Sequence, residues 1–393
     1  MSDKLPSSFY DWLVDLRRQF HQFPELQYEE KKTSAKICEV LENIGVPFQK
    51  GIGETGLVAR VSARRKGPVI AFRADMDALP LEEDNELPYK SRHQGIMHAC
   101  GHDAHITIGL GIIRWLVENR WTEKGAGEIL FIFQPAEEGG AGAKAMLDSG
   151  FFDSELVKAI FAGHVYPNFP VGDVAIGHGV SQASTTEIRI RLMGKGGHGA
   201  WPHQCNDPIV AGAYLVTQLQ TLVSRNLPPL ESAVLTIGSF HAGTASNIIP
   251  REAVLEGTLR TLNETVRENM AKRIRQVVGG VERVFDISAE LDLRDGYPMM
   301  ENHPELSKYA EACARDILGP GHVRQGVPSM GAEDFSYFCR KWGGVMVSLG
   351  CHDPQKEFCH GLHSPHFNLD ERVLDVGVRL FSRILTTYLE TCS

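Results

Sequence analysis

The first part of the chain alternates between amphipathic segments and short apolar runs. Apolar residues recur at helical spacing over 8–23 and 28–44, and Gly45 stands where a helix C-terminus favours glycine. Four strand-like runs follow, at 57–62, 69–73, 128–133 and 159–163. The more continuous of these runs are typical of strands that are buried on both faces of a sheet. The pattern predicts an α/β domain whose mostly parallel central sheet is flanked by helices.

The pattern changes near residue 183. Strand, helix, strand, strand, helix and strand signals follow one another, at 186–193, 208–225, 233–240, 253–262, 264–284 and 287–293. This order matches the ferredoxin-like α+β unit, which folds as a compact two-layer domain. Signals of the first type then resume, at 304–318, 345–349 and 370–390. We therefore predict one domain formed by 1–182 and 295–393, interrupted by an inserted ferredoxin-like domain at 183–294.

Composition narrows the class of partner. A chain of 393 residues with 42% hydrophobic and 23% charged residues can bury a large core and exceeds one average domain. Its formal charge of −9 is spread along the chain, and no Lys/Arg block indicates a nucleic acid or an anionic membrane as partner. The first ten residues lack the features of a secretion signal, and no apolar run approaches the roughly 20 residues of a membrane span. We expect a soluble cytoplasmic protein that acts on a small molecule.

The eight cysteines contain no C-x-x-C pair, which excludes a zinc ribbon and a thioredoxin motif. In a cytoplasmic protein most of them are expected to be buried, reduced thiols. Cys351 and Cys359 could form a disulfide in an oxidising compartment.

The run Met97–Asp103 places a thiol, Cys100, two residues before an imidazole, His102. Where disulfides are disfavoured, such a pair indicates either metal ligands or an activated nucleophile with its base. A separation of two residues is awkward for a nucleophile and base. Metal binding is therefore the favoured interpretation.

Further candidate ligands follow the predicted strands. Asp75 and Asp77 come after one strand, Glu137 and Glu138 after the next, and His164 ends a third. Open α/β sheets bind ligands at the carboxyl ends of their strands, so these groups are expected to converge. A mixed set of thiolate, imidazole and carboxylate ligands suits one or two divalent ions such as Zn²⁺, Mn²⁺, Co²⁺ or Ni²⁺. Of two adjacent glutamates, one can bind the metal while the other takes a proton from metal-bound water, which is the chemistry of hydrolysis.

Two local patterns mimic functional motifs. Gly51–Gly56 satisfies G-x-G-x-x-G, but a strand-like run follows instead of a helix, so we expect a turn. Asn263 begins a glycosylation acceptor pattern, and we expect it instead to start the helix at Glu264.

Several motifs in order resemble the metal-dependent amidohydrolases of the M20 peptidase family, in the branch of aminoacylases, hippurate hydrolases and auxin-conjugate hydrolases. The matching stretches are 72–80, 97–105, 133–138, 163–164, 194–203, 246–250, 331–335 and 363–367. The resemblance covers the chain nearly end to end.

The resemblance implies that two divalent metal ions (Zn, Mn, Co or Ni) are held by five residues, Cys100, His102, Glu138, His164 and His363. It also implies that Glu137 is the general base and later the general acid. The residues alone did not single out His363, because His352, His360 and His366 lie nearby in the sequence.

The resemblance further implies that the inserted domain serves as a lid and dimerisation domain. In similar proteins the residue equivalent to His198 helps to stabilise the oxyanion formed from the substrate carbonyl. Asn247 and Arg260 are candidates to bind the amide or carboxylate of the substrate. The expected activity is hydrolysis of N-acyl amino acids, such as N-acetyl or N-benzoyl conjugates, by a homodimer or homotetramer. A dipeptidase is the alternative, and a non-catalytic binder of acylated metabolites is disfavoured by the Glu137–Glu138 pair.

Overall fold

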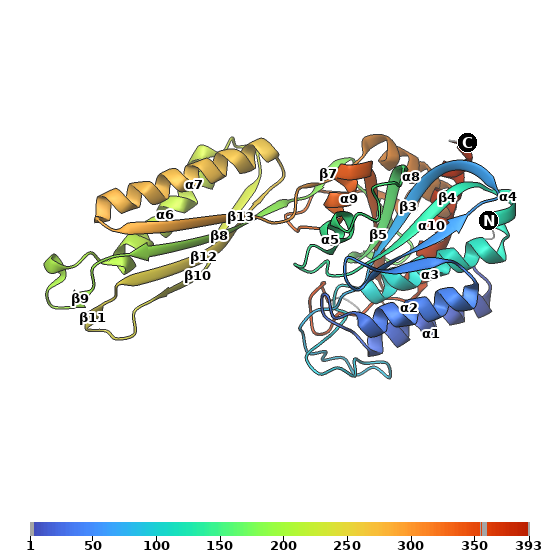
Figure 1. Cartoon of the computed structure of the whole chain (residues 1–393), viewed down its shortest axis with the longest axis horizontal. Coiled ribbons are helices and arrows are strands. Elements are labelled where there is room, and N and C mark those ends of the chain that lie inside the picture. The colour runs from blue at the N-terminus through green and yellow to red at the C-terminus, as the bar shows by residue number, and fades with distance from the viewer. Residues whose placement is uncertain (1–3, 354, 356–359, 392–393) are drawn as a thin grey trace. The chain divides into compact units, whose positions relative to one another are not determined.

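The computed structural model describes residues 4–353, 355 and 360–391 (Figure 1). Contacts divide the chain into two compact units. Unit 1 contains the chain up to Gly179, Glu301–Val327 and the chain from Tyr337 onward, and unit 2 contains Val180–Met300 and Pro328–Ser336. The predicted limits of the inserted domain, 183–294, and its role as a lid stay a prediction.

A mixed sheet forms the centre of unit 1. Its strands lie in the order β1 (Phe48–Ile52), β2 (Gly56–Ser62), β4 (Ala126–Gln134), β3 (Arg65–Asp75), β5 (Val157–Pro170) and β16 (Gly344–His352). The four strands β4, β3, β5 and β16 run parallel, whereas β1 and β2 are antiparallel to their neighbours. The predicted α/β class with a mostly parallel sheet is confirmed.

Helices cover this sheet, and most of them contribute buried apolar residues to one large core with it. The helices are α1 (Ser7–Gln22), α2 (Lys31–Ile44), α3 (His102–Glu118), α4 (Trp121–Lys124), α5 (Gly142–Asp148), α8 (Pro304–Leu318), α9 (Phe335–Trp342) and α10 (Arg372–Thr391). Shorter strands and turns also occur, namely β6 (Val174–Ile176), β7 (Gly179–Gln182), β14 (Met300–Asn302), η2 (Pro320–His322) and β15 (Val323–Gln325). The α3 helix packs against both α1 and α10, so the segment after Cys100 lies in the middle of the core.

Two boundaries differ from the sequence prediction. The helix expected from residue 28 begins at Lys31, because Tyr28 adopts a left-handed backbone with φ +60° and the preceding segment forms a β-bridge from Leu26 to Ala78. The sequence pattern also missed β1, which pairs antiparallel with β2. Gly51–Gly56 therefore belongs to a hairpin, and the expectation of a turn without a following helix is confirmed.

Unit 2 contains an antiparallel sheet in the order β10 (Ala233–Ala242), β12 (Glu252–Thr261), β8 (Ser184–Met193) and β13 (Ser288–Asp295). Together with α6 (Pro208–Asn226) and α7 (Glu264–Phe285) it has the predicted ferredoxin-like element order. The remaining short elements are β9 (Gly197–His198), η1 (Pro202–Gln204) and β11 (Ile248–Ile249). As expected, the Asn263 side chain caps α7, accepting hydrogen bonds from the amides of Thr265 and Val266.

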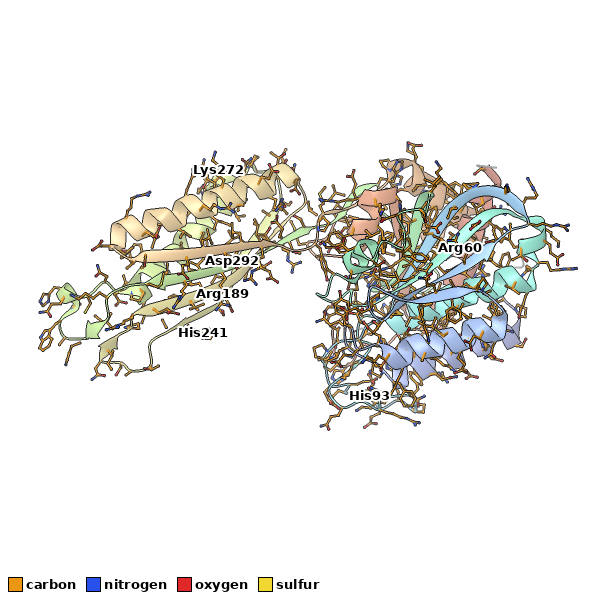
Figure 2. The ribbon with its side chains drawn as sticks, viewed as in Figure 1. Arg60, His93, Arg189, His241, Lys272 and Asp292 are labelled. Carbon is orange, nitrogen blue, oxygen red and sulfur yellow. The ribbon has the colours of Figure 1, made fainter. Side chains whose placement is uncertain are left out.

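The two faces of this sheet differ in polarity. Along β8, Ile188 and Ile190 are buried, whereas Arg189 and Arg191 are exposed. Arg189 lies opposite Asp292 of the neighbouring strand β13, and Figure 2 labels both side chains. The alternation is that of a sheet with one face against helices and one face in water.

Six described cysteines are free thiols, and four of them, Cys100, Cys313, Cys339 and Cys351, are buried. The suggested partner of Cys351, Cys359, lies outside the described residues. Among the helices that the structure describes, none has the length and apolar character required to cross a bilayer.

Candidate metal centre

The predicted site residues of unit 1 gather at the carboxyl ends of its parallel strands. Asp75 ends β3, and the segment that carries Glu137 and Glu138 follows β4. His164 lies within β5, not at its end as predicted, because β5 continues to Pro170 and pairs there with β16. Because the strands are parallel, their carboxyl ends meet at one edge of the sheet and bring these groups together.

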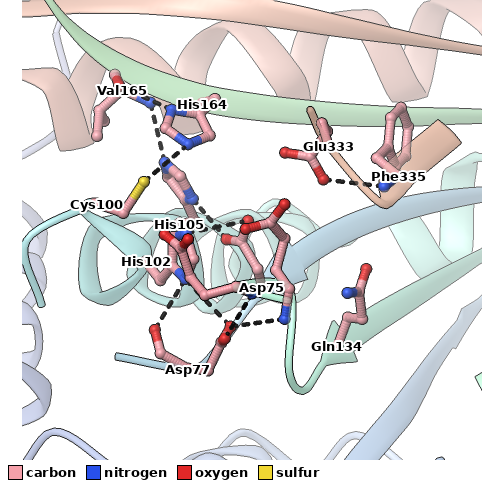
Figure 3. A network of polar contacts seen from close by, with 12 residues as sticks. Asp75, Asp77, Cys100, His102, His105, Gln134, His164, Val165, Glu333 and Phe335 are labelled. Carbon is pink, nitrogen blue, oxygen red and sulfur yellow. Dashed lines mark hydrogen bonds and ion pairs between the residues drawn. The ribbon is translucent and has the colours of Figure 1, made fainter. Parts of the chain in front are cut away.

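Gly101 brings the Cys100 segment against β5. It has φ +84°, and a Cβ atom on it would lie 2.3 Å from Cγ2 of Val165. This close approach requires glycine. The close approach places Sγ of Cys100 3.5 Å from Nε2 of His164 (Figure 3). Helix α3 begins at His102, directly after Gly101, and its first residue points to the same group of side chains.

Backbone carbonyls fix the tautomers of two imidazoles. Nδ1 of His102 donates to the carbonyl oxygen of Asp77 at 2.8 Å, and Nδ1 of His164 donates to its neighbour Val165 at 2.8 Å (Figure 3). Nε2 is therefore the atom of each ring that can bind a metal. At His102, Asp75, Asp77 and Cys100 outweigh burial and raise the pKa well above its usual range, so a metal ion would take the place of a proton there. Nε2 of His102 is buried without a hydrogen-bond partner. Burial also lowers the pKa of His164 to about 3, so its ring is neutral.

His363 reaches the same place from a loop. Its backbone has φ +62°, a left-handed conformation uncommon outside glycine, and its amide donates to the carbonyl of Ala99 at 2.9 Å. Nε2 of His363 lies 3.1 Å from Oε1 of Glu138. Contacts with the thiol of Cys100 and the carboxylate of Glu138 raise the pKa of His363 to about 10. A divalent cation would compete with this proton for the same nitrogen.

The structure distinguishes His363 from its neighbours in the sequence. His366 faces Asp84, 3.9 Å away, and the ring of His360 stands 5.1 Å from that of His366. His352 ends β16. Only His363 of these four belongs to a group of potential metal donors among the described residues.

The donor atoms form overlapping groups in which all members lie within 4.8 Å of one another. The groups within unit 1 are Cys100, His102 and His164; Cys100, Glu138 and His363; His102, Glu137 and Glu138; and Asp75, His102 and His105. The first two share the thiol of Cys100 and differ in their other members, so they could hold two ions. Thiolate, imidazole and carboxylate donors together fit zinc and similar transition metals.

Asp77 holds the pair of glutamates from behind. Its carboxylate oxygens accept the amides of Glu137 at 3.0 Å and of Glu138 at 2.9 Å, and its own carbonyl accepts Nδ1 of His102. Asp77, which follows the end of β3, thus orients three residues from two segments, the loop after β4 and the start of α3. The sequence placed Asp77 near the site, but the pairing of a side chain with two remote amides has no local signal.

A buried polar chain supports the site from the side of the sheet. Asp75 accepts Nδ1 of His105 at 2.6 Å and a guanidinium nitrogen of Arg73 at 2.6 Å, and Nε2 of His105 accepts the amide of Val165 at 2.9 Å (Figure 3). Although burial opposes ionisation, Arg73, His102 and His105 hold the pKa of Asp75 well below its usual range. Sequence reasoning missed the roles of Arg73 and His105. Their presence inside the motifs 72–80 and 97–105 was the available signal.

The three remaining predicted residues lie in unit 2. His198 is exposed and belongs to the short strand β9, which follows the end of β8 at Met193. Its Nδ1 accepts the amide of Ala200 at 3.1 Å, so a neutral ring carries its proton on Nε2. Asn247 is a close neighbour, since its carbonyl accepts the amide of Gly199 at 2.8 Å.

Arg260 stands apart from these two residues, on β12 of the four-stranded sheet. It is half-buried, and burial lowers the pKa of its guanidinium. Among the described residues no carboxylate forms an ion pair with Arg260. Its role as a substrate-binding residue stays a prediction.

Comparisons with known proteins show the family of the chain. The model of peptidase family M20/M25/M40 matches residues 71–387. An N-acetyldiaminopimelate deacetylase of Streptococcus sanguinis is 38% identical over 95% of this chain and 97% of the relative. A deacetylase of the same description from Halalkalibacterium halodurans is 40% identical over 96% of this chain and 99% of the relative.

A solved structure extends the likeness to three dimensions. The Bacillus subtilis YXEP protein, described as a dinuclear metal-binding peptidase of the M20 family, is 33% identical and superposes with a TM-score of 0.85. The match covers 98% of this chain and all of that one, 100%. The present chain belongs to peptidase family M20/M25/M40 and is a metal-dependent amidohydrolase of that family.

Proposed function

We propose that this protein hydrolyses the amide bond of N-acyl amino acids and releases a carboxylic acid and a free amino acid. The observation that carries the proposal is the position of Glu137. Its carboxylate lies within 4.8 Å of donor atoms of His102 and Glu138, beside the two overlapping donor groups. A binding protein would need the ligands but no second, adjacent carboxylate, whereas hydrolysis needs a group that moves a proton.

We assign the metal ligands as Cys100, His102, Glu138, His164 and His363. Bound divalent ions supply Lewis acidity and lower the pKa of bound water from ~16 toward ~7. The hydrogen bonds of Nδ1 to backbone carbonyls at His102 and His164 support the assignment, because they leave Nε2 of each ring as the atom that can bind a metal.

In this proposal Glu137 removes the proton of the attacking water and later delivers it to the leaving nitrogen of the substrate. Asp77 fixes the backbone from which Glu137 projects, so the carboxylate needs little reorientation during the reaction. His198 donates a hydrogen bond from Nε2 to the developing oxyanion, a role that fits its tautomer. Arg260, which has no carboxylate partner among the described residues, binds the carboxylate of the substrate, and Asn247 binds its amide.

The relatives that are described as N-acetyldiaminopimelate deacetylases indicate the first substrate to test. N-acetyldiaminopimelate is itself an N-acyl amino acid. We therefore propose N-acetyl groups as the preferred acyl class, with N-benzoyl and longer acyl groups as comparisons.

The decisive experiment measures amine release from N-acetyldiaminopimelate, N-acetyl and N-benzoyl amino acids and dipeptides. The enzyme is loaded with Mn²⁺ or Zn²⁺, and a chelated sample is the control. Release from the acylated substrates alone, lost on chelation, would support the proposal. Cleavage of dipeptides alone would favour a dipeptidase. Activity that survives chelation but not alkylation of Cys100 would point to a thiol nucleophile.

We also propose that the protein forms a homodimer or homotetramer through unit 2. The edge strand β10 is unpaired on one side within the described sheet and exposes Val234 and Phe240, and the neighbouring helix α6 exposes Val210 and Tyr214. Unpaired edges and clustered apolar side chains favour association between chains. Light scattering of the purified protein measures the mass, and a monomer at micromolar concentration would contradict the proposal.

A further inference from the structure

The loop that carries Glu137 and Glu138 is held from a second side, by a segment a hundred residues earlier in the chain. Between α1 and α2, Oε1 of Glu30 accepts the amide of Ala136 at 2.9 Å. Nearby, the hydroxyl of Tyr28 donates to the carbonyl of Gly140 at 2.6 Å. These contacts lie before and after the two glutamates, whereas Asp77 contacts the glutamates themselves.

Glu30 is built into the interior. Its side chain is fully buried, 0% exposed, and its other carboxylate oxygen accepts the hydroxyl of Thr55 from the β1–β2 hairpin. Burial raises the pKa of Glu30. A buried carboxylate without partners would be costly, but here both oxygens have donors. Glu30 therefore joins the start of α2, the hairpin and the loop after β4 at one point.

The loop itself adopts an unfavourable backbone. Ala136 and Ala141 both have positive φ, +52° and +54°, although neither is glycine. The loop is also tight, because a Cβ atom on Gly142 would lie 1.7 Å from the carbonyl oxygen of Pro135. A conformation of this kind persists only where surrounding contacts hold it. The hydrogen bond from Ala136 to Glu30 acts directly on one of the two unfavourable residues.

We infer that Glu30 is a positioning residue that keeps Glu137 and Glu138 in place by holding Ala136 in its left-handed conformation. The inference deepens the proposed function and rests on it for the role of Glu137. The position of the loop therefore depends mainly on whether the carboxyl group of residue 30 reaches the amide of Ala136, and less on the negative charge of Glu30.

Two substitutions of Glu30 distinguish the effect of side-chain length from the effect of charge. Glu30→Asp keeps the carboxylate but shortens the side chain by one methylene, so it withdraws the acceptor from Ala136. Glu30→Gln removes the charge but keeps Oε1 as an acceptor, and its amide group can donate to the hydroxyl of Thr55. We expect Glu30→Asp to lower kcat about 100-fold with KM unchanged, since small misplacements of a reacting group have effects of this size. Glu30→Gln is expected to stay within about threefold of wild type.

Glu25→Ala is the matched control. Glu25 belongs to the same segment and its carboxylate accepts the amide and the hydroxyl of Thr33 in the first turn of α2, at 2.8 and 3.0 Å. It has no hydrogen bond to the loop after β4 among the described contacts. We expect Glu25→Ala to lower Tm as much as Glu30→Asp does, with kcat close to wild type.

Hydrogen exchange, followed by mass spectrometry of peptides that cover residues 134–142, tests the inference without substrate. Exchange in this segment is expected to speed up about tenfold in Glu30→Asp and to stay at the wild-type rate in Glu25→Ala. Wild-type exchange and kcat in Glu30→Asp would overturn the inference, as would an equal loss of kcat in Glu25→Ala or in Glu30→Gln. If the wild-type enzyme cleaves no acylated substrate, the proposed function fails while the exchange rates still decide the role of Glu30.

Discussion

The proposed functional residues of the two units are held in opposite ways. In unit 1 the side chains of His102 and His164 are buried, and each has one ring nitrogen tied to a backbone carbonyl. In unit 2 His198 is exposed, and Arg260 has no ion-pair partner among the described residues. Groups that must hold an ion need fixed geometry, whereas groups that receive a variable substrate need access to it. The difference predicts that substitutions at the buried groups of unit 1 change activity, metal content or stability. Substitutions at the exposed groups of unit 2 should change kcat or KM but leave stability unchanged.

The largest effect is expected at Glu137. Glu137→Gln keeps the shape of the side chain but cannot accept a proton, so kcat should fall by about 10³-fold. Metal content, measured by elemental analysis, should remain at the wild-type value. Glu138→Gln is the contrasting variant, because it should lose metal as well as activity. Near-wild-type hydrolysis by Glu137→Gln would show that another group is the base.

A stability comparison sharpens the contrast between the units. In unit 1 Nε of Arg17 pairs with Oδ2 of Asp103 at 2.7 Å, and both side chains are 0% exposed. Arg17→Ala leaves a buried carboxylate without its main partner, and we expect the free energy of unfolding to fall by about 3 kcal/mol. In unit 2 Arg191 pairs with Glu252 on an exposed face, and Arg191→Ala should leave Tm unchanged. Thermal melts that show equal shifts for both variants would contradict the comparison.

His198 provides the next test. Loss of a hydrogen bond to the oxyanion should lower kcat by about 100-fold in His198→Ala, while metal content and Tm stay at wild-type values. His241→Ala is the matched control, since His241 is also an exposed histidine of unit 2, on β10 (Figure 2). If both variants keep full activity, His198 has no part in the reaction.

The smallest effect is expected at Arg260. Removing a charge-assisted contact with the substrate carboxylate should raise KM about tenfold in Arg260→Ala, with a minor change in kcat. Arg189→Ala on the neighbouring strand β8 controls for loss of positive charge in the same sheet. Steady-state kinetics with an N-acyl amino acid and with the matching N-acyl amine, which lacks the carboxylate, measure the effect. An equal change in KM for both substrates would mean that Arg260 does not contact the carboxylate.

The sequence predicted the elements of the fold closely where periodicity was strong. The α8 helix was expected at 304–318 and is found at Pro304–Leu318, because its apolar face packs on a core that the same residues define. The short strands β9 and β11 were missed, since two residues carry no period. The start of α2 was misplaced because the backbone at Tyr28 is set by contacts with remote segments.

For the site, local motifs identified the groups but not their supports. Cys100 and His102 lie two residues apart, and Glu137 and His164 follow or lie in apolar strands, so the chain order itself brings them together. His363 could not be chosen from the sequence alone, because its approach depends on a loop whose path no motif encodes. The role of Glu30 depends on contact with Ala136, 106 residues away, which only the folded chain reveals.

The close packing of Gly101 on Val165 has a consequence for the choice of ion. Because no side chain separates these segments, the sulfur of Cys100 and the ring of His164 approach to 3.5 Å. The backbone at Gly101 thus sets the distance between two of the proposed metal ligands, the thiol of Cys100 and the imidazole of His164. A side chain at position 101 should move the segment of Cys100 away from β5. The metal preference of Gly101 variants is therefore expected to shift from small to large cations.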